Sequence, residues 1–136
     1  MRKLPRSFYL RPAPRVAKDL LGKYLVRRIG GRALIARIVE TEAYCQSDPA
    51  SHSFRGLTNR NEVMFSKGGH LYVYFTYGMH FCANVVTGRA GKGEAVLLRA
   101  VEPIEGIDLM SKYRKQHSHP TERGDALQPN LTNGPA

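Results

Sequence analysis

Apolar and polar positions alternate or cluster in five short stretches of the chain, a pattern typical of β-strands. The first two expected strands, residues 23–29 and 32–41, flank Gly30-Gly31, which is typical of a two-residue hairpin turn. The other expected strands cover residues 70–76, 80–87 and 95–102. Most of the connections are too short for crossovers, so we expect a mostly antiparallel, curved sheet.

Two segments have helical spacing instead. Residues 14–21 begin with a proline and end before Gly22, and a second amphipathic helix is expected from Pro103 to about residue 115. Residues 44–69 form a long loop, with one helical turn expected near residues 59–65. The chain is therefore predicted to be a single α+β domain over residues 1–136, with helices flanking the sheet.

Composition narrows the class of protein. The chain has 136 residues, of which 42% are apolar and 24% charged, as expected for one globular domain. No apolar run reaches the roughly 18 residues that a membrane span needs, and no apolar segment follows the basic start, which argues against secretion. Cys45 and Cys82 suit neither a disulfide framework nor a zinc site. We expect two reduced thiols in an intracellular protein, in the cytoplasm or nucleoid of a bacterium or the nucleus of a eukaryote.

Positive charge is concentrated at the start of the chain. Lys and Arg number 21 against 11 Asp and Glu, a net charge of +10 with histidine neutral. Residues 2–32 hold ten of the basic side chains and only one acidic residue, Asp19, whereas residues 33–69 are balanced. The excess favours a polyanionic partner, either nucleic acid or an anionic membrane face. A basic solvated surface without a specific partner is the alternative.

Carboxylates occur at the end of the second expected strand. With a two-residue period, Glu40, Glu42 and Tyr44 share one face of that strand. A carboxylate there would be held by rigid backbone and open to a substrate, as a general base must be. Ordinary surface salt bridges are the alternative, and periodicity does not choose between the two glutamates.

Tyrosines are frequent in a chain without tryptophan. Tyr44, Tyr72, Tyr74 and Tyr77 each offer a ring for stacking on a base and a hydroxyl for orientation. Packing within the sheet is the alternative, and it suits Tyr72 best. Tyr77 precedes a glycine at an expected hairpin tip, where an exposed ring could wedge between base pairs.

Three other polar residues are candidates for the site. Asn84 and Arg99 are polar positions inside apolar strands, where each must find hydrogen-bond partners and could belong to a structural network. His52 lies in the long loop, where it could contact a ligand or simply be solvated. No histidine or cysteine pair has metal-site spacing, so we expect no metal.

Several segments in this order together resemble one known family. They are LLGKYLVRR (20–28), RIVETEAY (37–44), YVYFTYGMH (72–80), NVVT (84–87), LLRAVEP (97–103) and NGP (133–135). The set resembles the alkyladenine (3-methyladenine) DNA glycosylases of mammalian type, from about residue 8 to the end. This resemblance implies a monofunctional hydrolase of base-excision repair that removes alkylated or deaminated purines from duplex DNA without a cofactor. It also implies that the chain lacks the C-terminal part of the family's domain.

The resemblance assigns the chemistry to Glu42. Glu42 matches the family's catalytic base, which activates the water that attacks C1′ of the sugar. Arg99 matches a basic residue beside that water and the DNA backbone. An N-alkylated purine already carries positive charge, so it leaves readily as a neutral base. One carboxylate can then suffice where glycosidases usually need two.

The resemblance also assigns a pocket and a wedge. Tyr44 and Tyr74 match aromatic residues that sandwich the flipped base, and His52 matches a histidine that contacts it. Asn84 matches the asparagine that excludes guanine by a clash with its amino group. Tyr77 matches the residue that intercalates into the minor groove.

Two other readings remain open. The chain could be a non-catalytic basic protein that binds nucleic acid, with tyrosines stacking on bases and no bond cut. It could also be an inactive truncated remnant. A carboxylate beside Tyr44 favours the enzyme, because a pure binder gains nothing from a negative charge that faces phosphates. The expected partner is duplex DNA with a damaged purine, bound by a monomer.

Overall fold

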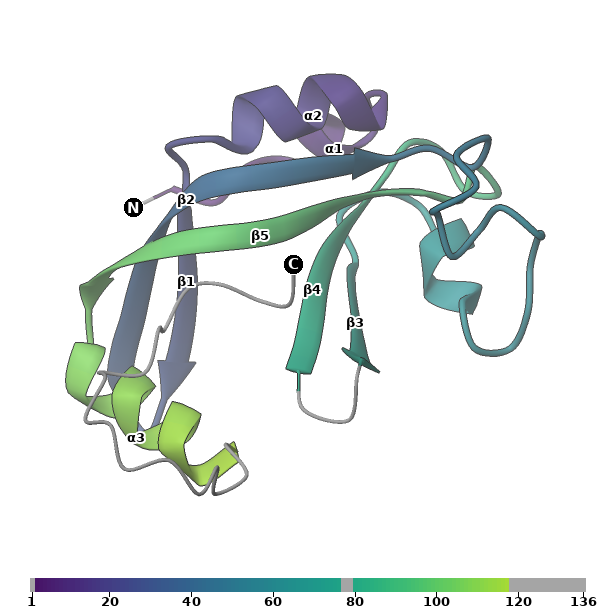
Figure 1. Ribbon diagram of the computed structural model, residues 1–136. Coiled ribbons are helices and arrows are strands. Elements are labelled where there is room, and N and C mark those ends of the chain that lie inside the picture. The colour runs from purple at the N-terminus through teal and green to yellow at the C-terminus, as the bar shows by residue number, and fades with distance from the viewer. Residues whose placement is uncertain (1, 77–79, 118–136) are drawn as a thin grey trace.

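Five antiparallel strands form one curled sheet in the order β1-β2-β5-β4-β3, as the computed structural model shows (Figure 1). The model describes residues 2–76 and 80–117. The strands are β1 (Tyr24–Ile29), β2 (Arg32–Tyr44), β3 (Leu71–Thr76), β4 (His80–Thr87) and β5 (Glu94–Glu105). The helices are α1 (Arg6–Tyr9), α2 (Ala13–Leu20), the 3-10 turn η1 (Glu62–Phe65) and α3 (Ile107–His117). The expected α+β class, with a mostly antiparallel curved sheet and flanking helices, is confirmed.

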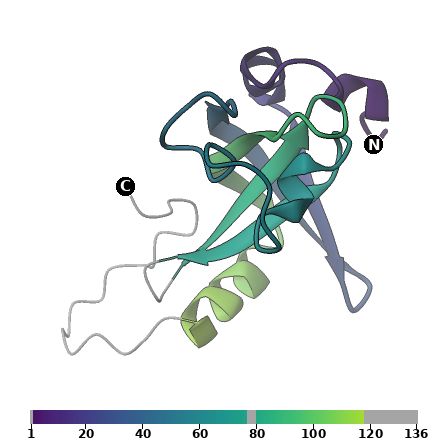
Figure 2. The ribbon, with the colours of Figure 1, turned by 90° about the vertical axis from the view of Figure 1, so that its right-hand side faces the viewer.

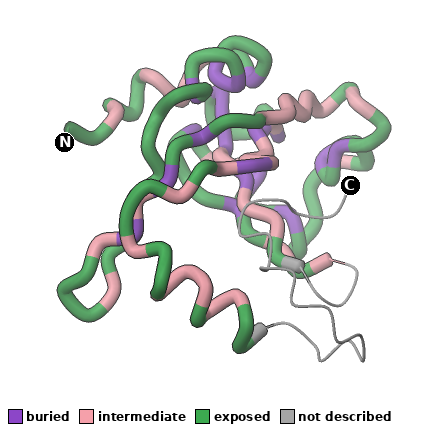
Figure 3. The backbone as a smooth tube through the Cα atoms, turned by 60° about the vertical axis from the view of Figure 1, so that its left-hand side comes forward, coloured by how far each residue is buried: buried purple, intermediate pink, exposed green. Residues whose placement is uncertain are grey.

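Helix α2 packs on one face of the sheet, and we call this the helix face. Its buried residues recur at helical spacing, at Ala13, Val16, Ala17 and Leu20, so they form one apolar stripe. This stripe packs on β2 and β5, where Ile38 and Val96 are buried. Figure 3 shows buried positions gathered where α2 meets the sheet, and no residue of 107–116 in α3 is buried.

A second, smaller core lies on the opposite face, which we call the site face. It contains Met64 of η1 together with Tyr72, Val86 and Ala95 from three neighbouring strands. The long connection between β2 and β3 carries η1 and packs on this core (Figure 2). The sheet is therefore covered on both faces where the end of β2 pairs with the start of β5.

Two strands are longer than the sequence pattern predicts, and α3 begins later. Pro103 lies within β5 opposite Ala36 and does not open the helix, so that expectation was wrong. The register shifts between Ile35 and Ala36, and such an irregularity tolerates a residue without an N–H. The strand ends at Glu105, before Gly106, whose φ of +78° is costly for other residues. The short helix α1 was not predicted.

The β3–β4 hairpin alternates as predicted, but its exposed face is the apolar one. Leu71, Val73 and Phe75 are all about half exposed, while Tyr72 is buried on the site face. The expectation that Tyr72 packs within the sheet is confirmed. No helix among residues 2–76 and 80–117 is long and apolar enough to cross a membrane.

Candidate active site

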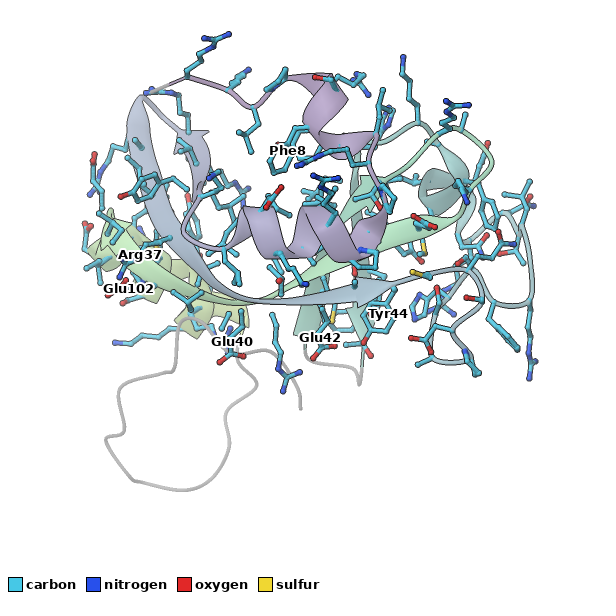
Figure 4. The ribbon with its side chains drawn as sticks, turned by 90° about the horizontal axis from the view of Figure 1, so that it is seen from above. Phe8, Arg37, Glu40, Glu42, Tyr44 and Glu102 are labelled. Carbon is cyan, nitrogen blue, oxygen red and sulfur yellow. The ribbon has the colours of Figure 1, made fainter. Side chains whose placement is uncertain are left out.

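A bulge in β2 brings the carboxylates onto the site face. Ile38 faces α2, yet Thr41 also reaches that helix, with its hydroxyl donating to the carbonyl of Ala17 at 2.9 Å. The register shifts at Val39, so one extra residue lets both positions face α2 despite their odd spacing. Glu40 and Glu42 consequently point to the opposite face. Figure 4 shows them in succession with Tyr44 along one side of β2.

The strand register places four residues in one row across the site face. Glu42 of β2 lies opposite Leu97 of β5, Leu97 opposite Asn84 of β4, and Asn84 opposite Tyr72 of β3. Residues directly opposite each other in neighbouring strands project to the same face. The sheet therefore carries the carboxylate, the buried amide of Asn84 and the Tyr72 ring on one surface. The Asn84 side chain donates to the Tyr72 carbonyl at 3.3 Å, which meets the expectation that it has a partner.

Two groups hold the Glu42 carboxylate. Nη1 of Arg99 lies 3.1 Å from Oε1, and the Tyr44 hydroxyl donates to Oε2 at 2.7 Å. This hydrogen bond, together with burial, raises the pKa of Tyr44 to about 12, so the phenol stays a donor at neutral pH. Each carboxylate oxygen retains a second lone pair for another donor such as water. Arg99 is thus a partner of Glu42, and Nε of the same guanidinium lies 3.5 Å from Glu40.

An aromatic cluster on the site face lies near Tyr44, close enough for Tyr44 to raise the pKa of Tyr74. The His52 ring centroid is 4.3 Å from that of Tyr74, and Nδ1 of His52 is 3.2 Å from the Tyr72 hydroxyl. Burial, helped by the charge of Arg60, lowers the pKa of His52, and burial raises the pKa of Tyr72 and Tyr74. At neutral pH the cluster is therefore uncharged. His52 is exposed to solvent, and it also contacts two tyrosine rings.

The residues that hold the His52 loop were not identified from the sequence. Buried Asn61 donates from its amide to the carbonyls of His52 at 2.8 Å and Gly56 at 3.0 Å. Buried Ser53 donates to the carbonyl of Gly93 at 2.5 Å, which ties the loop to the start of β5. The only sequence signal was the position of an asparagine and serines in a long loop, which fits many turns equally well.

An open hollow of about 460 Å³ is lined by Cys45, Gln46, Ser47, Phe54, Lys92 and Glu94, and none of these is a predicted site residue. In the part of the chain that the structure describes, no three His, Cys, Asp or Glu residues are grouped as metal ligands would be. Tyr77, the predicted wedge, lies outside the described residues.

The arrangement can perform acid–base chemistry next to a stacking surface. A carboxylate held from two sides can accept a proton from a water molecule in a defined direction. Uncharged tyrosine and histidine rings beside it can stack on a planar group, and electron-rich rings favour a planar cation. The site thus combines one candidate base with one aromatic wall.

Comparison with known proteins shows what the chain is similar to. The family model for methylpurine-DNA glycosylase matches residues 7–136. A protein of Carboxydothermus hydrogenoformans named "Putative 3-methyladenine DNA glycosylase" is 57% identical over 133 residues, covering 98% of this chain and 65% of that protein. A protein of the same name from Methanoculleus marisnigri is 58% identical over 111 residues, covering 82% of this chain and 57% of that protein. The chain spans less than two thirds of the length of these relatives.

Proposed function

Because the chain belongs to the methylpurine-DNA glycosylase family, we propose that it hydrolyses the N-glycosidic bond of alkylated or deaminated purines in duplex DNA. The observation that carries this proposal is the Glu42 carboxylate held by Arg99 and Tyr44 beside the rings of His52 and Tyr74. We further propose that the chain is intracellular and binds, as a monomer, duplex DNA with a damaged purine.

The base must leave the duplex before it can react. C1′ of a stacked nucleotide is not accessible, so the damaged nucleotide is flipped into the site at a cost of a few kcal/mol. Stacking on Tyr44, Tyr74 and His52 recovers part of this cost, about 1–3 kcal/mol for a base on an aromatic ring. Tyr77 fills the gap that the flipped nucleotide leaves. Asn84 excludes guanine from the pocket.

Glu42 then activates the water that replaces the base. The bond between C1′ and the purine nitrogen breaks, and its electron pair leaves with the base, which becomes neutral if it was an N-alkylated cation. A neutral purine such as hypoxanthine leaves as an anion, which takes a proton from solvent water. The water oxygen bonds to C1′, and its proton passes to the Glu42 carboxylate. Negative charge on Glu42 also stabilises the oxocarbenium-like sugar in the transition state. The products are a free purine and an abasic site.

Direct product analysis tests this function. The 136-residue chain is incubated with duplexes that carry one 3-methyladenine or one hypoxanthine, and free base and abasic sites are measured. We expect both products in equal amounts, without strand cleavage. Lesion binding without base release would instead support the non-catalytic binding protein, and neither binding nor release would contradict the proposed function.

Tyr77→Ala tests the wedge. We expect weaker binding to lesion-bearing duplex and a smaller loss on undamaged duplex, because the phosphate contacts remain. Binding of the two duplexes is compared by fluorescence anisotropy. An equal loss of affinity for both would contradict the role of Tyr77 as a wedge.

A further inference from the structure

Arg99 is shared between two carboxylates. Its Nη1 lies 3.1 Å from Glu42 and its Nε lies 3.5 Å from Oε2 of Glu40. The guanidinium therefore lies between the candidate base on one side and a second glutamate on the other. Glu40 has no part in the chemistry proposed above.

The sheet is irregular at the point where these side chains meet. Glu40 lies opposite Ala100 and Thr41 lies opposite Leu98, so Arg99 falls outside the paired register. An irregularity of this kind changes the direction of a side chain at a local cost in pairing, and such irregularities are frequent next to active sites. Val39 is likewise unpaired on β2. The two strands thus depart from regular pairing where Glu40, Arg99 and Glu42 come together.

We propose that Glu40 is a positioning residue that holds Arg99 in the orientation in which it binds Glu42. The guanidinium is a planar, rigid fork of donors, so an acceptor on the Nε side restricts its rotation and aims Nη1. Glu40 acts through Arg99 and does not touch the reacting atoms. This inference rests on the proposed function of Glu42.

Other roles for Glu40 explain less. Its side chain is 59% exposed, and an ion pair so accessible to water contributes little to stability. A role in DNA binding is also unfavourable, because a carboxylate on the site face repels phosphates. Orientation of Arg99 is the benefit that offsets this repulsion.

The chain offers a matched control on the same two strands. Glu102 of β5 is ion-paired with Arg37 of β2, both about half exposed (Figure 4). Glu102→Gln therefore removes one negative charge and leaves Arg37 with only a neutral amide acceptor, as Glu40→Gln does for Arg99, but not beside Glu42. The comparison separates a role in the site from the general effect of losing such a pair.

The test measures single-turnover base release and duplex affinity for the wild type, Glu40→Gln and Glu102→Gln, with thermal melts of all three. For Glu40→Gln we expect release to slow by about tenfold or more, since a small misplacement of a catalytic group has such effects. Its affinity for lesion-bearing duplex should be unchanged or tighter, because a negative charge is lost. Glu102→Gln should release base at the wild-type rate.

Two results would overturn the inference. One is an equal release rate for Glu40→Gln and Glu102→Gln. The other is a Glu40→Gln variant whose rate, affinity and melting temperature all fall together, which would indicate a purely structural role.

A second readout does not need activity. In ¹H–¹⁵N spectra, we expect the Arg99 Nε–H signal to exchange with solvent faster in Glu40→Gln than in the wild type and Glu102→Gln. If the wild type released no base, the proposed function would fail, and this signal would still decide whether Glu40 holds Arg99. Equal protection in all three proteins would overturn the inference.

Discussion

Each oxygen of Glu42 has a partner, and the two partners differ in kind. Arg99 supplies a permanent charge to Oε1, and Tyr44 supplies a neutral hydroxyl to Oε2. The two contacts come from different strands, so the carboxylate plane is fixed relative to the sheet and not merely to its own backbone. The proposed function depends on how firmly the plane of the Glu42 carboxylate is held.

Tyr44→Phe tests the second contact. The variant keeps the ring for stacking but removes the hydrogen bond to Glu42. Hydrogen bonds to charged groups contribute about 1.5–3 kcal/mol, so we expect base release to slow by about 10- to 100-fold. Lesion binding, measured by anisotropy, should change little. A release rate equal to that of the wild type would show that Tyr44 does not orient Glu42.

His52 makes stability depend on pH in a defined direction. Because the fold lowers its pKa below the ordinary value of 6.5, the unfolded chain takes up a proton first as the pH falls. The unfolding free energy contributed by His52 is therefore complete above about pH 6.5 and is lost as the pH falls through the lower folded pKa.

The difference in unfolding free energy between pH 7.5 and 5.5 measures this contribution in urea titrations. His52→Gln should lose less stability on acidification than the wild type. His70→Gln is the control, since the described contact of that exposed ring is with the backbone carbonyl of Lys67. Identical pH dependence in the wild type and His52→Gln would contradict the account.

The strands show which structural features local sequence patterns can predict. Alternating or clustered apolar residues predicted all five strands, and the short connections predicted a mostly antiparallel sheet. Alternation also places Glu40 and Glu42 on one face, but it does not reveal which face. That depends on the bulge at Val39, which arises from pairing with β5, a strand more than 50 residues later in the sequence. Local pattern contains no information about such a partner.

The loop that carries His52 illustrates the same limit. Its conformation is fixed by Asn61 and by the contact of Ser53 with Gly93, and that contact joins residues 40 positions apart. Individual serine, asparagine and glycine residues predict turns but not which distant group each will meet. The role of the loop could be stated from the family resemblance, whereas its supports required the structure.

Gly93→Ala tests the packing contact between that loop and the start of β5. The added methyl would lie 2.8 Å from Cε1 of Phe65 at a backbone φ of +66°. Gly91→Ala is the matched control, with a φ of +86° but no atom within 4 Å of the new methyl. Both variants bear the backbone strain of about 1–2 kcal/mol. Gly93→Ala adds an overpacking cost of about 1–3 kcal/mol.

Thermal melts of the two glycine variants check this expectation. We expect the melting temperature of Gly93→Ala to fall clearly below that of Gly91→Ala. Equal melting temperatures would show that the loop moves away from β5 without cost.

Across the whole molecule, part of the positive charge lies away from the candidate site. Much of the basic N-terminal segment belongs to α1, α2 and their flanks, and α2 covers the helix face. Part of this charge is engaged, since Arg11 pairs with Asp19 and Arg6 donates to the carbonyl of Gly68. On the site side, Arg60 is close enough to lower the pKa of His52. Net charge therefore predicted a polyanionic partner without showing where that partner docks.

Arg60→Gln and Lys18→Gln separate the two faces. A duplex bound at the site face should contact Arg60, and each lost phosphate contact reduces the slope of log affinity against log salt by about 0.9. We expect that reduction for Arg60→Gln and a smaller change for Lys18→Gln, whose side chain is on exposed α2. The slopes are measured by anisotropy between low and physiological salt. The reverse order would place the duplex on the helix face.

The central claim is that Glu42 is the base of a DNA glycosylase, and Glu42→Gln tests it most directly. Single-turnover release of 3-methyladenine and hypoxanthine is measured for the wild type and Glu42→Gln, with lesion binding measured on the same duplexes. We predict that Glu42→Gln no longer releases base, while its binding persists or becomes tighter because a negative charge facing the phosphates is removed. Release at the wild-type rate by Glu42→Gln would contradict it.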